Sequence, residues 1–195
     1  MHETSFRNMQ YFVSRYLDHG TGERLRILDI GSRYVNGTYR PLFDRPGWIY
    51  TGLDTERGEN VDIAVNDPYR WKELRRESFD LVISGQTLEH VEYFWITMLE
   101  IARVLKTGGL LCLIVPSAGP EHKYPVDCWR FYPDGIRALA RHACLEVIDA
   151  HFASAREEDP VTPDQWHDTM LIARKNRMTP AGRARIFIRR ALTRF

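Results

Sequence analysis

The 195-residue sequence has few cysteines and no long apolar run, and each shortage excludes a class of protein. The three cysteines, Cys112, Cys128 and Cys144, form no CxxC pair and are odd in number, which argues against a disulfide framework or a cysteine zinc site. No run of about eighteen apolar residues occurs, so no membrane-spanning helix is predicted. The first residues, MHETSFRNMQYF, lack the basic start and apolar stretch of a secretion signal. We therefore expect a cytoplasmic protein.

Acidic residues are missing from the C-terminal part of the chain. From Arg174 onward there are eight Lys or Arg and no Asp or Glu, although the whole chain carries a net charge of only +1. The preceding residues therefore hold 19 basic and 26 acidic side chains, a net charge of about −7. An acidic body is a poor match for a nucleic-acid groove, because that binding depends on neutralising phosphates. We expect no nucleic-acid partner.

The order of apolar and polar blocks indicates an α/β fold. Helices are predicted at residues 6–17, 68–78, 91–105 and 133–143, with a short helix at 38–43 and the Gly108-Gly109 pair as the stop of the third. Strands are predicted at 25–30, 48–54, 61–65, 79–84, 110–116, 145–152 and 168–175. Their alternation predicts a doubly wound, mostly parallel sheet of seven strands. Because no helix joins the last two strands, we expect them to pair antiparallel at one edge of the sheet.

The chain divides into a single domain, residues 1–176 with an N-terminal helix within 1–20, and a tail, residues 177–195. The tail segment TPAGRARIFIRRALTRF places its apolar residues on one helical stripe and its arginines mostly opposite. This pattern is typical of a basic amphipathic helix, which can lie on an anionic membrane surface as a peripheral contact. The alternatives are docking on its own domain or on a second subunit, and a homodimer is left open.

The stretch ILDIGSRYVNG, residues 27–37, places a carboxylate and a glycine where the first strand ends. In doubly wound sheets, ligands bind at the carboxyl ends of the strands, and Gly31 permits a sharp turn and a close backbone approach. A second strand ends in Asp54, at a suitable distance for a ribose diol. The glycine spacing is not GxGxxG, and bulky Arg33 and Tyr34 stand where a pyrophosphate needs bare backbone. A cationic ligand without phosphates therefore fits better.

These segments resemble the class I S-adenosylmethionine-dependent methyltransferases. The likeness covers roughly residues 25–175 and rests on LDIGSRYVNG, on GLD at 52–54, and on FDLVISGQTLEHV followed by LEIARVLKTGGLLCLIVPS. It implies a Rossmann-like fold, S-adenosylmethionine as methyl donor and S-adenosylhomocysteine as product. Arg33 or Tyr34 replaces the family's usual central glycine. Carried over by position, the resemblance implies cofactor contacts by Asp29, Gly31 and Ser32 at the methionine end, Asp54 at the ribose, Asp67 at the adenine amino group and Gln86 beside the sulfonium.

A hydroxyl acceptor must also lose its proton, to a base or with the help of a metal. The candidate bases are His90, His122, Asp127, His151 and His167. The segment Gln86-Thr87-Leu88-Glu89-His90 resembles the Glu-x-x-Glu-His pattern of ubiquinone-type O-methyltransferases, with an amide replacing one carboxylate. That resemblance implies Mg²⁺ or another divalent cation at Glu89 and His90. We further predict Asp127, or alternatively His122, as the residue that completes the site. The alternatives are a helix start without a metal, or His90 as a metal-free base; the catalytic candidates are Glu89, His90 and Asp127.

The segment SAGPEHKYPVDCWRFYPDG, residues 117–135, interleaves aromatic rings with hydrogen-bonding groups, as a sugar site requires. The candidate acceptor-binding residues are His122, Tyr124, Trp129, Arg130 and Tyr132. The segment also resembles the acceptor loops of methyltransferases of polysaccharide biosynthesis, including the mannoside O-methyltransferases of actinobacterial methylated polysaccharides. We therefore expect a sugar O-methyltransferase acting on a glycan or glycan precursor. The alternatives are a phenol or quinone-precursor O-methyltransferase, a non-catalytic methyltransferase-like subunit, or a purely structural aromatic lid.

Overall fold

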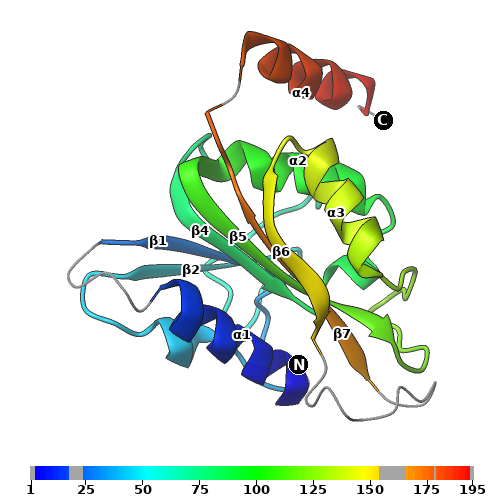
Figure 1. The fold of residues 1–195 in the computed structure, drawn as a ribbon. Helices are drawn as coiled ribbons and strands as arrows, with labels where there is room; N and C mark the ends of the chain where they lie inside the picture. The colour runs from blue at the N-terminus through cyan, green and yellow to red at the C-terminus, as the bar shows by residue number, and fades with distance from the viewer. Residues whose placement is uncertain (1–2, 18–23, 154–165, 178, 194–195) are drawn as a thin grey trace.

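The computed structural model describes residues 3–17, 24–153, 166–177 and 179–193. Its strands form one seven-stranded sheet in the order β3-β2-β1-β4-β5-β7-β6 (Figure 1). The strands are β1 (Arg26–Ile30), β2 (Ile49–Asp54), β3 (Ile63–Ala64), β4 (Phe79–Gly85), β5 (Leu105–Ala118), β6 (Glu146–Ala153) and β7 (His167–Arg174). The helices are α1 (Glu3–Tyr16), α2 (Phe94–Val104), α3 (Pro133–His142) and α4 (Pro180–Leu192), with 3-10 turns η1 (Arg40–Phe43) and η2 (Leu88–His90).

Strand direction follows the expected doubly wound pattern. Strands β3, β2, β1, β4 and β5 pair in parallel, and β7 pairs antiparallel with both β5 and β6. The prediction of a mostly parallel sheet with an antiparallel last strand is confirmed. The chain leaves β1 toward β2 and β3, then returns to the other side of β1 to form β4. The strand order therefore reverses at β1, where ligands bind in sheets of this kind.

Alternate residues of the central strands feed two separate cores. Leu28 packs in the core under α2 and α3, whereas its neighbour Ile27 packs in the core under α1. Figure 1 shows α1 on one face of the sheet and α2 and α3 on the other. Because both faces are covered, the central strands are almost continuously apolar, as the sequence of β5 indicated.

The helix predicted at 68–78 is wrong: this segment forms turns. Its apolar Trp71 and Leu74 are buried, with 2% and 6% of their surface exposed. Side chains of α2 satisfy the backbone groups that a helix would have paired: Arg103 donates to the carbonyls of Trp71 and Leu74 at 2.8 Å each, and Glu100 accepts from the Trp71 amide at 3.2 Å. A tertiary contact therefore replaces the expected intrahelical hydrogen bonds.

The helix predicted at 91–105 begins at Phe94 and ends at Val104, before the expected Gly108-Gly109 stop. The chain enters β5 directly at Leu105, and the glycine pair lies within that strand. Gly108 and Gly109 exchange backbone hydrogen bonds with Lys175, just beyond β7, at 2.6 and 3.0 Å. Pairing across the sheet therefore ends this helix.

Candidate functional site

A cleft of about 690 Å³ opens at the carboxyl ends of β1, β2 and β4. Its lining includes Asp29 and Gly31 from the end of β1, Asp54 from the end of β2, and Gln86 after β4. Residues 122–126, in the loop after β5, also line the cleft. Ser32 also lines the cleft, so five of the six residues predicted to bind the cofactor share one cavity.

Asp29, near the end of β1, is a buried carboxyl group with 3% of its surface exposed. It accepts a hydrogen bond from the Tyr50 hydroxyl. Burial raises the pKa of Asp29 to about 7, against the opposing effect of the Tyr50 hydrogen bond. Burial and the neighbouring Asp29 charge likewise raise the pKa of Tyr50, so the phenol remains a donor. A cation in the cleft would stabilise the ionised form of Asp29.

Gly31 adopts a left-handed conformation with φ of 74°, and a Cβ there would lie 2.1 Å from the Thr87 hydroxyl oxygen. Both reasons require glycine at this position. The next residue, Ser32, donates from its hydroxyl to the Asn60 carbonyl at 3.0 Å, and the Asn60 side chain donates to the Ser32 carbonyl at 2.7 Å. The turn after β1 is therefore tied to the segment after β2.

Asp54 organises the turn that follows β2. Its carboxylate accepts from the backbone amides of Arg33 at 3.0 Å, Thr55 at 2.7 Å and Glu56 at 3.2 Å. Asp67, the predicted adenine contact, is exposed and accepts from the Tyr69 amide at 2.8 Å. Asp67 is not part of the cleft lining, although Pro68 and Tyr69 are.

Gln86 is held by a carboxylate that sequence patterns do not identify. Its backbone has a φ of 56°, and its Nε2 donates to Asp168 Oδ1 at 2.8 Å. Asp168 is 1% exposed, also accepts from Asn8 at 3.3 Å, and has its pKa raised to about 6 by burial. The Gln86 Oε1 atom is buried without a hydrogen-bond partner among the described residues. Asp168 therefore fixes the orientation of an amide in the cleft.

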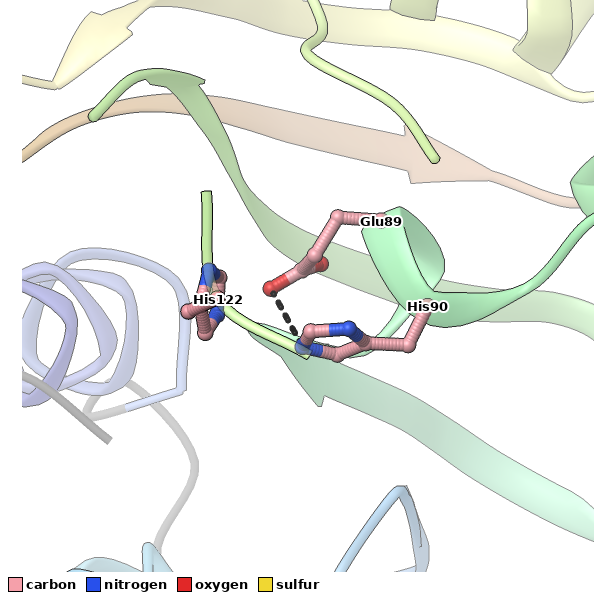
Figure 2. A group of neighbouring side chains, drawn as sticks. All are labelled: Glu89, His90 and His122. Carbon is pink, nitrogen blue, oxygen red and sulfur yellow. Dashed lines mark ion pairs between the residues drawn. The ribbon is translucent and has the colours of Figure 1, made fainter. Parts of the chain in front are cut away.

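Glu89, His90 and His122 form a compact group (Figure 2), and its two histidines line the same cleft as Gln86. One ligand atom from each residue lies within 4.8 Å of the others, and His90 Nε2 lies 3.7 Å from a Glu89 oxygen. Glu89 is fully buried, and within the described parts of the chain neither of its carboxylate oxygens has a hydrogen-bond partner. Burial raises the pKa of Glu89 to about 8. A buried carboxylate without a donor beside two imidazoles is the arrangement that a divalent cation would satisfy.

One of the two imidazoles is oriented by a hydrogen-bonding partner: His90 Nδ1 lies 2.6 Å from the Val126 carbonyl oxygen. His122 Nδ1 lies 3.3 Å from Asp127 Oδ2, but it makes no hydrogen bond to the described residues. Burial lowers the pKa of His90, which favours the neutral imidazole. A carbonyl or carboxylate at one ring nitrogen is the usual support of a metal-binding histidine. The group can therefore hold a metal, and neutral His90 can also accept a proton.

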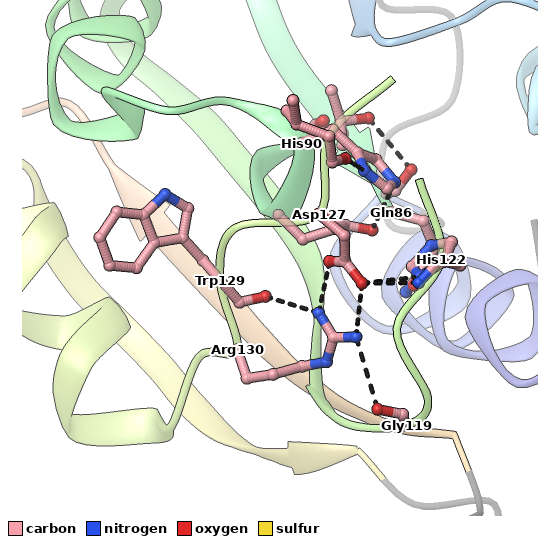
Figure 3. A network of polar contacts seen from close by, with 12 residues as sticks. Gln86, His90, Gly119, His122, Asp127, Trp129 and Arg130 are labelled. Carbon is pink, nitrogen blue, oxygen red and sulfur yellow. Dashed lines mark hydrogen bonds and ion pairs between the residues drawn. The ribbon is translucent and has the colours of Figure 1, made fainter. Parts of the chain in front are cut away.

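Asp127 lies beside this group rather than in it (Figure 3). Its carboxylate accepts two hydrogen bonds from Arg130, at 2.6 and 2.9 Å, and one from the His122 amide at 2.8 Å. These bonds, the Arg130 pair first, hold the pKa of Asp127 well below its usual range. Arg130 also donates to the Pro120 carbonyl at 2.9 Å. The pair braces the loop, and the third member of the group is His122, one of the two completions that the sequence left open.

The other predicted acceptor residues divide between the cleft and its surroundings. Tyr124 lines the cleft, is 57% exposed, and lies 6.0 Å from the His90 ring. Trp129 lies outside the lining, where its indole donates to the Glu92 carbonyl at 3.2 Å and packs edge-on against Phe94. Tyr132, also outside it, packs against Phe152. Among the remaining candidate bases, His151 pairs with Asp149, and His167 is buried at the start of β7 away from the cleft.

Comparison with known proteins supports this picture of the fold. Residues 28–113 match the family model described as methyltransferase domain. No curated protein sequence matches the chain significantly.

Solved structures with the same fold act in different ways. The 1,6-didemethyltoxoflavin N1-methyltransferase of Burkholderia thailandensis, with bound S-adenosylhomocysteine, is 17% identical; the match covers 89% of this chain and 79% of that chain, with a TM-score of 0.67. The phosphoethanolamine N-methyltransferase 2 of Haemonchus contortus, in complex with S-adenosylmethionine, is 16% identical; the match covers 87% of this chain and 53% of that chain, with a TM-score of 0.64. The cyclase SpnF is 17% identical; the match covers 88% of this chain and 81% of that chain, with a TM-score of 0.66. Likeness at this identity shows the Rossmann-like methyltransferase fold, not the reaction.

Proposed function

We propose that the chain is an S-adenosylmethionine-dependent O-methyltransferase that methylates a hydroxyl of a sugar, as part of a glycan or its precursor. The observation that carries this proposal is the shared cleft. The same cavity is lined by Asp29, Gly31 and Asp54 at the ends of β1 and β2 and by His90 and His122. A donor nucleoside and an acceptor hydroxyl therefore have a place to meet.

The donor side suits a cationic nucleoside. Asp29 supplies a buried carboxylate for the methionine end, and ionisation of Asp29 is favoured by the positive charges of the sulfonium cofactor. Asp54 faces the cleft at the end of β2, where a ribose diol can donate to it. Its carboxylate is already held in place by three backbone amides, so little ordering is needed on binding.

The acceptor side suits the removal of a hydroxyl proton. His90 lines the cleft and is oriented by the Val126 carbonyl, and burial lowers its pKa, which favours the neutral imidazole whose Nε2 can act as a base or ligand. The orphaned Glu89 carboxylate, with His90 and His122, fits a divalent cation, which when bound would lower the pKa of a hydroxyl acceptor. One carboxylate and two imidazoles suit Mn²⁺ or Zn²⁺ better than Mg²⁺, which prefers oxygen ligands.

A sugar acceptor is supported by the groups around this site. Tyr124 presents an exposed aromatic ring for the apolar face of a pyranose, and Lys123 lines the same part of the cleft as a hydrogen-bond donor. Gln86 also lines the cleft, so its side-chain amide is a further hydrogen-bonding group beside the acceptor position. These neighbouring polar groups favour a polyol over a flat phenol.

The donor half of the proposal is tested by calorimetry with S-adenosylmethionine and S-adenosylhomocysteine. We expect both to bind wild type, and Asp54→Ala to weaken binding at least about tenfold through the lost ribose contacts. The absence of binding to either compound by wild type would refute the proposal at its base.

The acceptor half is tested by methyl transfer from labelled donor to oligosaccharides, with a catechol as the competing acceptor. We expect His90→Gln to retain S-adenosylhomocysteine binding and lose at least about a hundredfold in turnover, the usual contribution of a general base. His151→Gln, which changes a histidine outside the cleft, should leave turnover unchanged. Transfer to the catechol alone would refute the sugar acceptor, and full turnover in EDTA would exclude the metal.

A further inference from the structure

Helix α4 docks on the domain mainly through polar contacts. Arg190 forms an ion pair with Glu100 of α2, and Arg189 donates to the His142 carbonyl at the end of α3. Ile186 is the only buried residue of α4, with 7% of its surface exposed, and it packs in the core under α2 and α3. Figure 1 shows α4 lying beside α2, beyond the face of the sheet.

The opposite side of α4 is apolar and faces outward. Phe187, Ile188 and Leu192 are 73%, 54% and 79% exposed, and Ala184 and Ala191 on the same stripe are also exposed. An amphipathic helix of a globular domain normally buries its apolar stripe and exposes its charges. Here the arrangement is reversed, because the arginines that hold the helix occupy the inner side.

Two exposed arginines, Arg183 and Arg185, flank this apolar stripe. From Arg174 to the end of the sequence no acidic residue balances them. A two-fold contact with a second copy of the chain would pair the stripe with itself and place its positively charged borders opposite one another. An apolar stripe bordered by two exposed arginines, for which the described residues supply no ion pair, instead complements a layer of anionic headgroups over acyl chains.

We propose that α4 is an interfacial helix that docks the domain on an anionic membrane. Phe187, Ile188 and Leu192 enter the boundary between headgroups and acyl chains, and Arg183 and Arg185 lie at the lipid phosphates. Because Arg189 and Arg190 remain tied to α3 and α2, binding carries the whole domain to the surface. The proposal does not depend on the chemistry of the cleft, although it would place a glycan-modifying enzyme near lipid-linked acceptors.

Co-sedimentation of the full chain with vesicles tests the proposal. We expect binding to vesicles of phosphatidylcholine mixed with phosphatidylglycerol, and little binding to phosphatidylcholine alone. Phe187→Ser combined with Leu192→Ser should weaken binding at least about tenfold, because both side chains lose their apolar burial in the interface. Arg183→Gln with Arg185→Gln should weaken it by a similar factor and remove most of its salt dependence.

Tyr11→Ser is the matched control, since it removes a 48% exposed aromatic ring from another helix, α1. It should leave vesicle binding unchanged, and thermal unfolding should confirm that every variant is folded. Equal sedimentation of wild type and the Phe187/Leu192 variant would overturn the proposal. So would a wild-type dimer, seen by analytical ultracentrifugation without lipid, that the same double variant converts to a monomer: the stripe would then be a contact between copies.

Discussion

Replacement of Asp29 by asparagine should make the protein more stable and less able to bind its cofactor. Asparagine has nearly the same size and can accept the Tyr50 hydrogen bond, but it cannot ionise. In the wild type, burial raises the pKa of Asp29 from 3.8 to about 7. The folded state therefore favours the protonated carboxyl, and the ionised form is costly to keep inside the cleft wall.

The sign and size of the effect follow from linkage between protonation and folding. Because the folded pKa lies above the unfolded one, the stability associated with Asp29 is fully present below pH 3.8 and is lost as the pH rises through about 7. A shift of about three pKa units corresponds to about 4 kcal/mol in full. Between about pH 5 and about pH 8, the free energy of unfolding of Asp29→Asn should gain about 3 kcal/mol relative to wild type.

The measurement is urea denaturation followed by tryptophan fluorescence at several pH values. The Asp134→Asn variant is the control, because its carboxylate is 98% exposed, and its difference from wild type should not change with pH. Calorimetry on the same Asp29→Asn protein should give at least about tenfold weaker S-adenosylmethionine binding, since the carboxylate that faces the cation is gone. If the stability difference between Asp29→Asn and wild type did not depend on pH, the assignment of Asp29 as a buried carboxyl group with a raised pKa would be refuted.

Three further variants probe the rest of the site. Gly31→Ala should abolish S-adenosylhomocysteine binding in calorimetry, because the new Cβ would lie 2.1 Å from the Thr87 hydroxyl and φ is 74°; unchanged affinity would contradict the role of this turn. Glu89→Gln should lower the affinity for Mn²⁺, measured by calorimetry with the metal alone, at least about tenfold, because the only carboxylate of the three-residue group is lost; equal affinity would remove the metal site. Asp168→Asn should reduce kcat more than it changes S-adenosylhomocysteine affinity, because the amide of Gln86 loses its charged partner at 2.8 Å; a change in thermal stability alone would indicate a purely structural role.

Local sequence patterns were sufficient for most of the sheet and for the residues that line the cleft at the ends of β1 and β2. Most of the strands are short apolar blocks, and Asp29 and Asp54 lie where two of these blocks end. Parallel strands bring their carboxyl ends to the same edge, so residues in these positions necessarily become neighbours once the sheet forms. The positions of Gly31 and Ser32 follow from the same reasoning, because they continue directly from β1.

The acceptor side depended on contacts between distant segments. Apolar periodicity gives no information on which polar groups meet across the fold, and His122 joins Glu89 and His90 only because the loop after β5 folds back over η2. Asp168 reaches Gln86 across 82 positions for the same kind of reason.

Tertiary contacts also overruled two local patterns. The segment 68–78 has helical spacing, but side chains of α2 capture its backbone groups. The sequence predicted that α4 is amphipathic, but it did not predict which side of the helix contacts the domain. The ion pair between Arg190 and Glu100 of α2 holds the arginine side against the domain and leaves the apolar stripe exposed. The sequence of a helix or strand shows which of its faces is apolar and which is polar. Which other segment packs against each face depends on the charges and apolar surfaces of the whole folded chain.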